Sequence, residues 1–148
     1  MMLSKATEYA IRGLVYINMQ NRKGDRPGFR EVAREVDAPE HFMAKILQTL
    51  TRHQLIRSAK GRGGGFFFPE KEEQLRLYEV IRVMEGEAFF SKCVFGFNMC
   101  DDKHPCPMHE DFVKIRDEFV ELAKTQSIQS LAHKIENQQA HLTGLNIS

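Results

Sequence analysis

The sequence predicts a mainly α-helical protein with a small β-hairpin, and three observations support this fold class. Apolar residues recur at helical spacing along most of the 148-residue chain. A glycine-rich turn at 61–65 separates two short apolar runs, as in a hairpin. Hydrophobic residues make up 42% and charged residues 28% of the chain, a composition typical of a globular domain long enough to bury a core.

The N-terminal segment predicts a first helix that runs to about Gln20. Ser4 has the short, oxygen-bearing side chain that is preferred at helix N-caps. A turn-rich stretch at 21–28 then separates this helix from the next one. The apolar face of the helix is formed by Ala10, Gly13, Leu14 and Ile17.

Two short amphipathic helices follow, separated by the break Asp37–Pro39. Proline is tolerated in the first turn of the second helix, because its missing N–H has no partner there. Two such helices with a three-residue break predict a helix-turn-helix. Their apolar stripes are Phe29, Val32, Ala33 and Val36 for the first helix, and Met43, Ile46, Leu47 and Leu50 for the second.

The polar face of the second helix predicts contact with DNA bases. Glutamine can read an adenine edge, whereas lysine and arginine meet guanine edges or phosphates. A solvated helix face is the alternative interpretation of the same residues. The face opposite the apolar stripe carries no acid and consists of His41, Lys45, Gln48 and Arg52.

A β-hairpin is predicted directly after the helix-turn-helix, with strands at Leu55–Ile56 and Phe66–Phe68. Lys60 and Arg62 in its turn suit contact with phosphate or the minor groove. The glycine run is not a nucleotide phosphate loop, because it lacks the G-K-[ST] ending and a strand follows it in place of a helix. The hairpin therefore predicts the wing of a winged helix-turn-helix.

Three further helices are predicted after the wing. The first ends at Gly86, a natural helix stop, the second is long, and Ser127 caps a short third. The apolar side of the long helix lies outside the winged-helix unit, and a second copy of the chain would bury it. Folding back onto its own domain is the alternative. The three stripes are Leu77, Val80, Ile81 and Met84; Phe112, Ile115, Phe119, Leu122 and Ala123; and Ile128, Leu131 and Ile135.

The predicted fold class is thus mainly α with a small β-hairpin wing: a winged helix-turn-helix plus a long C-terminal dimerisation helix. Two-fold symmetry would match a palindromic double-stranded DNA operator read by two helices. Residues 1–62 hold 12 basic and 6 acidic residues, against 9 and 14 in 63–148, which favours a front half that faces a polyanion. The expected parts are a DNA-binding domain at 1–86, a cysteine-containing loop at 87–109, dimerisation and last helices at 110–136, and a flexible tail at 137–148.

Neither a membrane-spanning segment nor a signal peptide is predicted, since no apolar run approaches the roughly 20 residues of a span. The expected compartment is the cytoplasm, where thiols are kept reduced. An odd count of three cysteines also argues against a disulfide framework.

The cysteines Cys93, Cys100 and Cys106 lie within fourteen residues, and His109 follows them. Three thiolates and an imidazole form a ligand set for zinc or an iron–sulfur cluster. Zinc sites usually contain a tight C-x₂₋₄-C pair, whereas the gaps here are six and five residues, so a wider cluster is favoured. Buried thiols without a ligand are an alternative. A Cys-dependent enzyme is disfavoured because no oriented third group or oxyanion-hole motif is visible.

The stretches LSKATEYAIRGLVYI, REVAREVDAPEHFMAKILQTLTRHQLIRSAKGRGGGF and LYEVIRVMEG resemble the Rrf-two (Rrf2) family of bacterial winged-helix transcription regulators. The resemblance covers about residues 1–132, and KGRGGGF and the helix ending in MEG are its most specific parts. It implies homodimers that cross through the long C-terminal helix. Some members carry no cofactor, and others hold a [2Fe-2S] or [4Fe-4S] cluster through three cysteines placed as Cys93, Cys100 and Cys106 are here.

The resemblance implies two candidates for the fourth cluster ligand. In the branch that monitors cluster supply, a histidine three residues after the last cysteine serves, and His109 has this spacing. In nitric-oxide- and redox-sensing branches, a first-helix carboxylate of the partner subunit serves, and Glu8 holds that position. The first cysteine gap is six residues where the commonest pattern has five. Ala44 stands where the cluster-supply branch can carry glutamate, which implies a different operator.

The sequence therefore predicts a homodimeric transcription repressor, not an enzyme, that senses nitric oxide, redox or iron–sulfur status. Its cluster would be held by Cys93, Cys100, Cys106 and either His109 or Glu8. Loss of the cluster would release the loop, shift the recognition helices and so change operator affinity. The alternatives are a regulator that uses the loop for zinc or a protein partner, and a small Cys-dependent enzyme.

Overall fold

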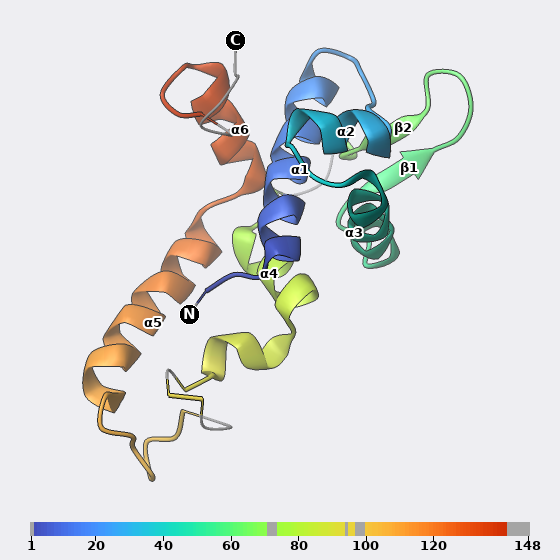
Figure 1. Ribbon diagram of the computed structural model, residues 1–148. Coiled ribbons are helices and arrows are strands. Elements are labelled where there is room, and N and C mark those ends of the chain that lie inside the picture. Colours follow the sequence, from blue (N-terminus) through green and yellow to red (C-terminus); the bar gives the residue numbers. More distant parts are fainter. Residues whose placement is uncertain (1, 71–73, 94, 97–99, 142–148) are drawn as a thin grey trace.

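The computed structural model describes residues 2–70, 74–93, 95–96 and 100–141. Helix α1 lies at the centre, and α2, α3, α4, α6 and the hairpin all pack against or beside it (Figure 1). The hairpin and helix α5 lie at opposite ends of the molecule (Figure 1). In chain order the elements are α1 (Lys5–Arg22), α2 (Phe29–Glu35), α3 (Glu40–Arg52), β1 (Arg57–Ala59), β2 (Gly65–Phe67), α4 (Leu77–Glu85), the 3-10 helix η1 (Glu87–Ser91), α5 (His109–Thr125) and α6 (Ile128–Glu136).

The first helix begins where the sequence predicts. The Ser4 hydroxyl accepts a hydrogen bond from the Thr7 backbone N–H at 3.2 Å, so Ser4 is the N-cap. The helix continues to Arg22, two residues beyond the predicted end. Leu14 and Ile17 are fully buried, which makes α1 the centre of the main core.

The predicted helix-turn-helix is confirmed. Between α2 and α3 the chain turns at Asp37, which has a φ of 56°, and the Ala38 N–H donates to the Ala33 carbonyl at 2.8 Å. The stripe of α3 is buried as expected, with Met43 and Leu47 both 0% exposed. Burial of this stripe fixes the orientation of α3 and turns its opposite face outward.

The hairpin forms, but its strands are shifted relative to the prediction. Antiparallel pairing joins Arg57 to Phe67 and Ala59 to Gly65. The predicted first strand at Leu55–Ile56 is wrong, because the Leu55 N–H bonds to the Leu50 carbonyl at 3.0 Å and closes the end of α3. Ile56 is 1% exposed and belongs to the main core.

The base of the wing is anchored to the loop before α2. The Phe66 N–H donates to the Pro27 carbonyl at 2.9 Å, and the Arg26 guanidinium lies 3.9 Å from the centroid of the Phe67 ring. Gly65 has a φ of 147°, and a Cβ there would overlap the Arg26 carbonyl oxygen. Only glycine fits this close approach, so backbone geometry explains the glycine at position 65.

The MEG sequence at the end of α4 joins this helix to the start of α1. The Glu85 carboxylate accepts hydrogen bonds from the Thr7 hydroxyl at 2.6 Å and the Ser4 N–H at 2.7 Å. Partial burial would raise the pKa of Glu85, but the hydrogen bonds from Thr7 and Ser4 outweigh it and the pKa is lowered. Gly86, with a φ of 93°, then ends α4 as the sequence predicts.

The described residues of 87–125 form an arm, composed of η1, the described part of the cysteine loop and α5, that extends away from the rest (Figure 1). Helix α5 is held by a small second cluster, in which Phe119 and Ala123 meet Phe89 of η1 and Ile81 of α4. The five apolar residues of the predicted stripe do not share one buried side. Phe112 and Ala123 are buried, whereas Ile115 and Leu122 are 62% and 52% exposed. The short helix η1 was not predicted by periodicity.

Helix α6 returns to the body and packs along α1. Ser127 caps it as predicted and forms a capping box with Ser130. The Arg22 guanidinium donates to the Glu136 carboxylate at 3.0 Å and fastens the C-terminal end of α6 to that of α1. The predicted flexible tail falls largely on 142–148, outside the described residues. Across the described residues, no helix is long and apolar enough to span a membrane.

Candidate functional site

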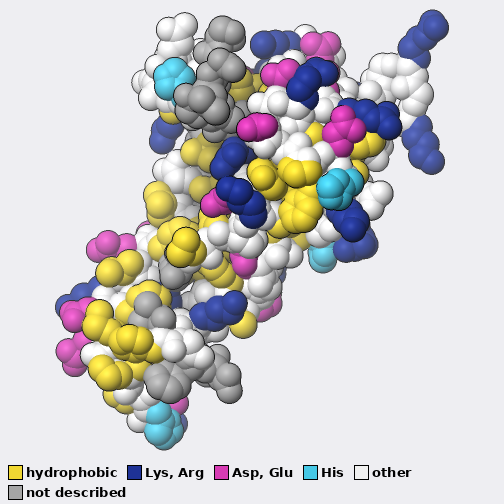
Figure 2. All heavy atoms as spheres, viewed as in Figure 1, with side chains coloured by type: hydrophobic (Ala, Val, Ile, Leu, Met, Phe, Trp, Pro, Cys, Tyr) yellow, Lys and Arg dark blue, Asp and Glu magenta, His cyan; other side chains and the backbone are white. Residues whose placement is uncertain are grey.

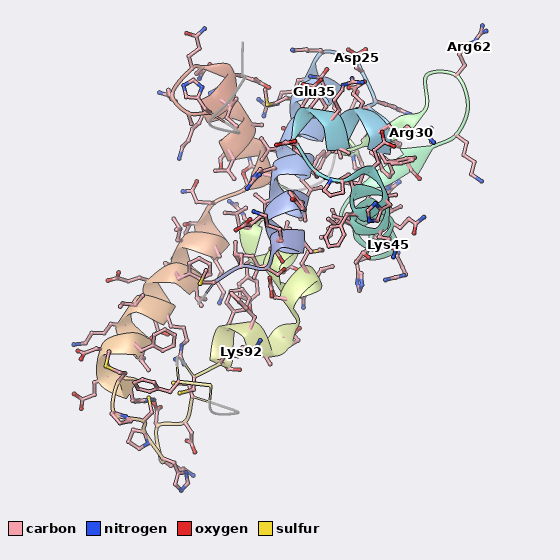
Figure 3. The ribbon with its side chains drawn as sticks, in the orientation of Figure 1. Asp25, Arg30, Glu35, Lys45, Arg62 and Lys92 are labelled. Carbon is pink, nitrogen blue, oxygen red and sulfur yellow. The ribbon has the colours of Figure 1, made fainter. Side chains whose placement is uncertain are left out.

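The outward face of α3 presents four side chains that the sequence proposes as DNA contacts. All four are exposed, while the opposite face of the helix is buried in the core. Lys45, labelled in Figure 3, projects away from the body. A helix that is held by one buried face and exposes hydrogen-bond donors on the other can enter a major groove. These residues are His41, Lys45, Gln48 and Arg52.

The wing tip carries the two cations that the sequence proposes there. Lys60 and Arg62 are both exposed, and Arg62 lies at the far end of the hairpin turn (Figure 3). Figure 2 shows Lys or Arg side chains projecting beyond the surface on the side where Figure 1 places the hairpin turn. Gly61 and Gly63 adopt φ values of 88° and 76°, which a side chain would strain. The glycines thus shape a tight turn that displays positive charge to solvent.

A polar groove lies between the C-terminal end of α3 and the first wing strand. Its volume is about 580 Å³, and it is lined by Thr51, Gln54, Ile56, Arg57 and Ser58. Hydroxyl, amide and guanidinium donors in this position suit the sugar–phosphate backbone of a strand that runs from α3 to the wing. Sequence reasoning missed this groove, because it is formed only when α3 and β1 pack together.

Arg30 is a second feature that sequence reasoning missed. It lies on α2 beside the start of α3, with its Nε 3.6 Å from a Glu40 carboxylate oxygen. In Figure 3 it lies on the same side of the molecule as Lys45 and Arg62. Its side chain is 75% exposed, so the ion pair is weak and leaves the guanidinium available to phosphate.

The structure places the three cysteines and His109 at the far end of the arm as two contacting pairs, Cys100 with His109 and Cys93 with Cys106. His109 is the first residue of α5, and its Nδ1 lies 3.3 Å from the Cys100 sulfur. The Cys106 thiol forms a hydrogen bond with the Cys93 thiol and interacts electrostatically with Cys100. Cys93 is buried at 9% exposure, whereas Cys100 and Cys106 are half-buried. None of the three forms a disulfide among the described residues.

Backbone hydrogen bonds attach the cysteine loop to the helices on both sides. The Cys100 N–H donates to the Ser91 carbonyl of η1 at 2.8 Å. The His109 N–H donates to the Cys106 carbonyl at 3.0 Å, and the Met108 N–H bonds to the Cys106 sulfur. The N-terminal end of α5, where the helix dipole is positive, therefore lies against a cysteine sulfur. A change in the conformation of the loop would therefore act directly on the N-terminal end of α5.

Burial, with a smaller effect of the neighbouring thiols, shifts the pKa of one of the three cysteines. Desolvation raises the pKa of Cys106. The Met108 N–H works in the opposite direction, and the neighbouring Cys93 and Cys100 add to the increase. Three thiolates side by side repel one another unless a cationic centre is shared among them. The raised pKa therefore favours the protonated form of the Cys106 thiol in the chain without a bound metal centre.

The donor set fits an iron–sulfur cluster. Three cysteine sulfurs with one imidazole nitrogen are the soft ligands that such clusters take, and Asp102 supplies a hydrogen-bond partner for the imidazole at 2.8 Å. Among the described residues, no group of three or more His, Cys, Asp or Glu side chains converges as the ligands of one metal ion would. Sequence reasoning predicted the cysteines and His109, but not Asp102.

Glu8, the other proposed fourth ligand, has different partners within the chain. Its carboxylate lies 3.4 Å from the Lys5 ammonium and 3.7 Å from the Arg12 guanidinium, both on α1. Its side chain is 37% exposed. Within one chain the structure thus pairs His109 with Cys100, and Glu8 with cations of its own helix.

Comparisons with known proteins agree with this geometry. The family model "Rrf2: Iron-dependent Transcriptional regulator" matches residues 3–134. Protein aau3 of Rhizobium meliloti (strain 1021) is 32% identical over 88% of this chain and 84% of its own length. The HTH-type transcriptional repressor NsrR of Streptomyces coelicolor is 31% identical over 73% and 68%. The structure of CymR, the global cysteine regulator of B. subtilis, superposes with a TM-score of 0.72 at 19% identity, over 90% of this chain and 97% of that one.

These matches confirm the predicted fold class of a winged helix-turn-helix with a small hairpin and a long C-terminal helix. Because the family and its members are transcriptional regulators, the prediction that the chain is not an enzyme is also confirmed. The function shown is regulation of transcription through DNA binding. The chain belongs to the Rrf2 family of transcriptional regulators.

Proposed function

We propose that this chain is a homodimeric repressor whose affinity for a palindromic operator is controlled by an iron–sulfur cluster. Cys93, Cys100, Cys106 and His109 would hold the cluster. The observation that carries the proposal is the pairing of these side chains near the junction of η1 and α5, Cys100 with His109 and Cys106 with Cys93. The description of the matching family as iron-dependent supports it, and a relative named as a repressor supports the direction of control.

When bound, the cluster supplies a centre that reacts with nitric oxide and oxidants and is lost when iron is scarce. The protein's own part is to hold the loop in one conformation. Cys100 is bonded to the end of η1 and Cys106 to the start of α5, so ligation through both would tie these two elements together. Cytoplasmic location, where thiols stay reduced, is part of the same proposal.

A second copy of the chain is the proposed partner of the arm. Met108, Ile115 and Leu122 are 43%, 62% and 52% exposed along α5 and at its start, and Figure 2 shows hydrophobic side chains gathered over this part of the molecule. Apolar surface of this kind on a regulator marks an interaction site. A two-fold dimer would place two α3 helices for the two halves of a palindrome.

The contacts offer a route from the cysteine loop to the DNA-reading helix. Helix α5 packs on α4 through Ala123 and Phe119, and Glu85 at the end of α4 holds the start of α1. Helix α1 in turn packs against α2 and α3. Release of the loop would let α5 move and bias the spacing or order of the two α3 helices in the dimer. Control of affinity requires only that the two arrangements differ in free energy.

The proposed DNA contacts fall into two classes. Side chains on α3 would read base edges, and those at the wing would contact phosphate or the minor groove. The exposure of all six residues, and the polar groove between their two elements, support this division. The base-reading residues are His41, Lys45, Gln48 and Arg52, and the wing residues are Lys60 and Arg62.

A cluster-free regulator that binds zinc is the second candidate. Three thiols and an imidazole also form a common zinc set, which is the observation that favours it. The loop could then serve as a fixed structural support or a docking site for a protein. Zinc does not change oxidation state, so such a protein would not sense redox through the metal itself.

Anaerobic purification followed by analysis of iron, acid-labile sulfide and zinc tests both candidates. The proposal predicts a coloured protein with iron and sulfide, and a colourless Cys100→Ser variant. His109→Ala should lose the cluster faster than wild type, whereas Glu8→Gln, the matched control, should retain it. A protein that stays colourless after anaerobic reconstitution contradicts the proposal, and stoichiometric zinc without sulfide establishes the alternative. Faster loss in Glu8→Gln than in His109→Ala would reassign the fourth ligand.

A further inference from the structure

The cysteine loop contains two carboxylate–imidazole pairs with equal N–O distances, made through different ring nitrogens and in different surroundings. Asp102 Oδ1 lies 2.8 Å from His109 Nε2, and Asp101 Oδ2 lies 2.8 Å from His104 Nδ1. The His109 side chain is 12% exposed and also contacts Cys100, whereas the His104 side chain is 84% exposed. One pair therefore faces the thiols and the other faces solvent.

The hydrogen bond to Asp102 determines which His109 nitrogen faces the thiols. A carboxylate accepts hydrogen bonds, so His109 Nε2 must carry the hydrogen that is donated to Asp102. The neutral ring then has its lone pair on Nδ1, the atom 3.3 Å from the Cys100 sulfur. The same bond limits rotation of the ring about its side-chain torsions, while the His109 N–H is fixed to the Cys106 carbonyl.

We propose that Asp102 is a positioning residue that presents His109 Nδ1 as the fourth ligand of the cluster. This inference rests on the proposed function. A carboxylate partner fixes the tautomer and orientation of a ligating histidine and increases its basicity. Removal of such a partner typically lowers metal affinity by about 10- to 100-fold. Since the Asp102 side chain is 93% exposed, water competes for the bond and the lower end of that range is expected.

Asp101 provides a matched control, because it is adjacent, makes an equally short bond to a histidine, and also accepts from the Lys103 N–H at 2.9 Å. Asp102→Ala should lose its cluster to a chelator about 10-fold faster than wild type. Asp101→Ala should lose it at close to the wild-type rate. Asp102→Asn keeps an acceptor oxygen and should fall between wild type and Asp102→Ala. The readout is the decay of visible absorption under anaerobic conditions.

Nitrogen NMR of the cluster-free protein shows which His109 ring nitrogen carries the hydrogen. This tautomer would not change if Asp102 only stabilised the fold of the loop. Wild type and Asp101→Ala should show the hydrogen on Nε2, and Asp102→Ala should show a mixture of tautomers. Equal cluster-loss rates in the two alanine variants, or an Nδ1–H tautomer in wild type, would overturn the inference and leave the proposed function intact. A wild-type protein without iron and sulfide would overturn both.

Discussion

The body of the molecule and its arm are stabilised in different ways. Around α1, the main core buries side chains from α2, α3, α4, α6 and the segment before the wing, and Leu14, Leu47 and Ile128 are fully enclosed. In the arm, α5 is held through Ala123 and its neighbours and leaves Ile115 exposed to solvent. Burial of apolar surface contributes about 25 cal/mol per Å² to the free energy that stabilises the folded state. A single chain thus buries the apolar core of the body. In the arm, apolar side chains of α5 stay exposed, and the thiols could bind a further ligand.

The two regions also differ in what they present to solvent. The body displays basic and amide side chains on α3 and at the wing. The arm displays the half-buried thiols of Cys100 and Cys106 and exposed apolar residues of α5. In the proposed function, this division places recognition of a polyanion in the body and sensing and assembly in the arm.

The largest expected effect is loss of stability when the core of the body is truncated. Leu47→Ala, at a 0% exposed position of α3, should lower the free energy of unfolding by about 2–5 kcal/mol. Ile115→Ala, at a 62% exposed position of α5, should change that of the monomer by less than about 0.5 kcal/mol. Urea titrations at low protein concentration check both. Similar losses in the two variants would show that the arm is as tightly packed as the body.

Dimer dissociation should respond to substitutions in the arm and not to substitutions in the body. The double variant Ile115→Ala and Leu122→Ala removes apolar side chains that a second chain would cover, and should raise the dimer Kd by about tenfold or more. Sedimentation across a range of concentrations gives this Kd. Phe42→Ala is the control, since Phe42 is 38% exposed but lies on α3 in the body. A Kd that responds to Phe42 and not to α5 would place the interface elsewhere.

A smaller effect is expected at the wing. Lys60→Ala or Arg62→Ala should weaken binding to all DNA sequences and reduce the salt slope of log K by about one unit each. Lys92→Ala is the matched control, because Lys92 lies at the end of η1, far from α3 and the hairpin (Figure 3). Fluorescence anisotropy at several salt concentrations measures the slope. If Lys92→Ala lowers the salt slope of log K as much as Arg62→Ala does, the arm also contacts DNA.

The smallest effect concerns the joint between the two regions. Because the pKa of Glu85 in the folded chain lies below its ordinary value of 4.5, its stabilising contribution is complete above that pH and is lost as the pH falls through the folded pKa. Between about pH 5 and pH 3, the Tm of wild type should fall by roughly 2–4 °C more than that of Glu85→Gln. Glu87→Gln, at an exposed position paired with Arg82, serves as control. Parallel curves for wild type and Glu85→Gln would show that the hydrogen bonds to Ser4 and Thr7 add nothing.

Sequence reasoning predicted the body well, because each of its helices carries a buried stripe and a recognisable end. Ser4, Gly86 and Ser127 mark helix ends through local chemistry that needs no tertiary contact. The strand at Leu55–Ile56 was wrong because a short apolar run looks the same whether it pairs in a sheet or closes a core. Ile56 does the latter.

The candidate site was only partly predictable. Cysteine spacing was enough to group Cys93, Cys100 and Cys106 with His109. The roles of Asp102 and Arg30 depend on which side chains the folded loop and the α2–α3 packing bring within hydrogen-bonding distance. Periodicity also placed Ile115 and Leu122 on the buried side of α5, but the neighbouring helix covers only part of that face.

The central claim is that the state of the arm controls DNA binding by the body. Operator DNA selected from random duplexes allows its Kd to be measured anaerobically, before and after the cluster is removed with nitric oxide. The account predicts a change of about fivefold or more in wild type and none in Cys100→Ser, whose Kd should equal that of cluster-free wild type. An identical Kd for wild type with and without its cluster would contradict the account.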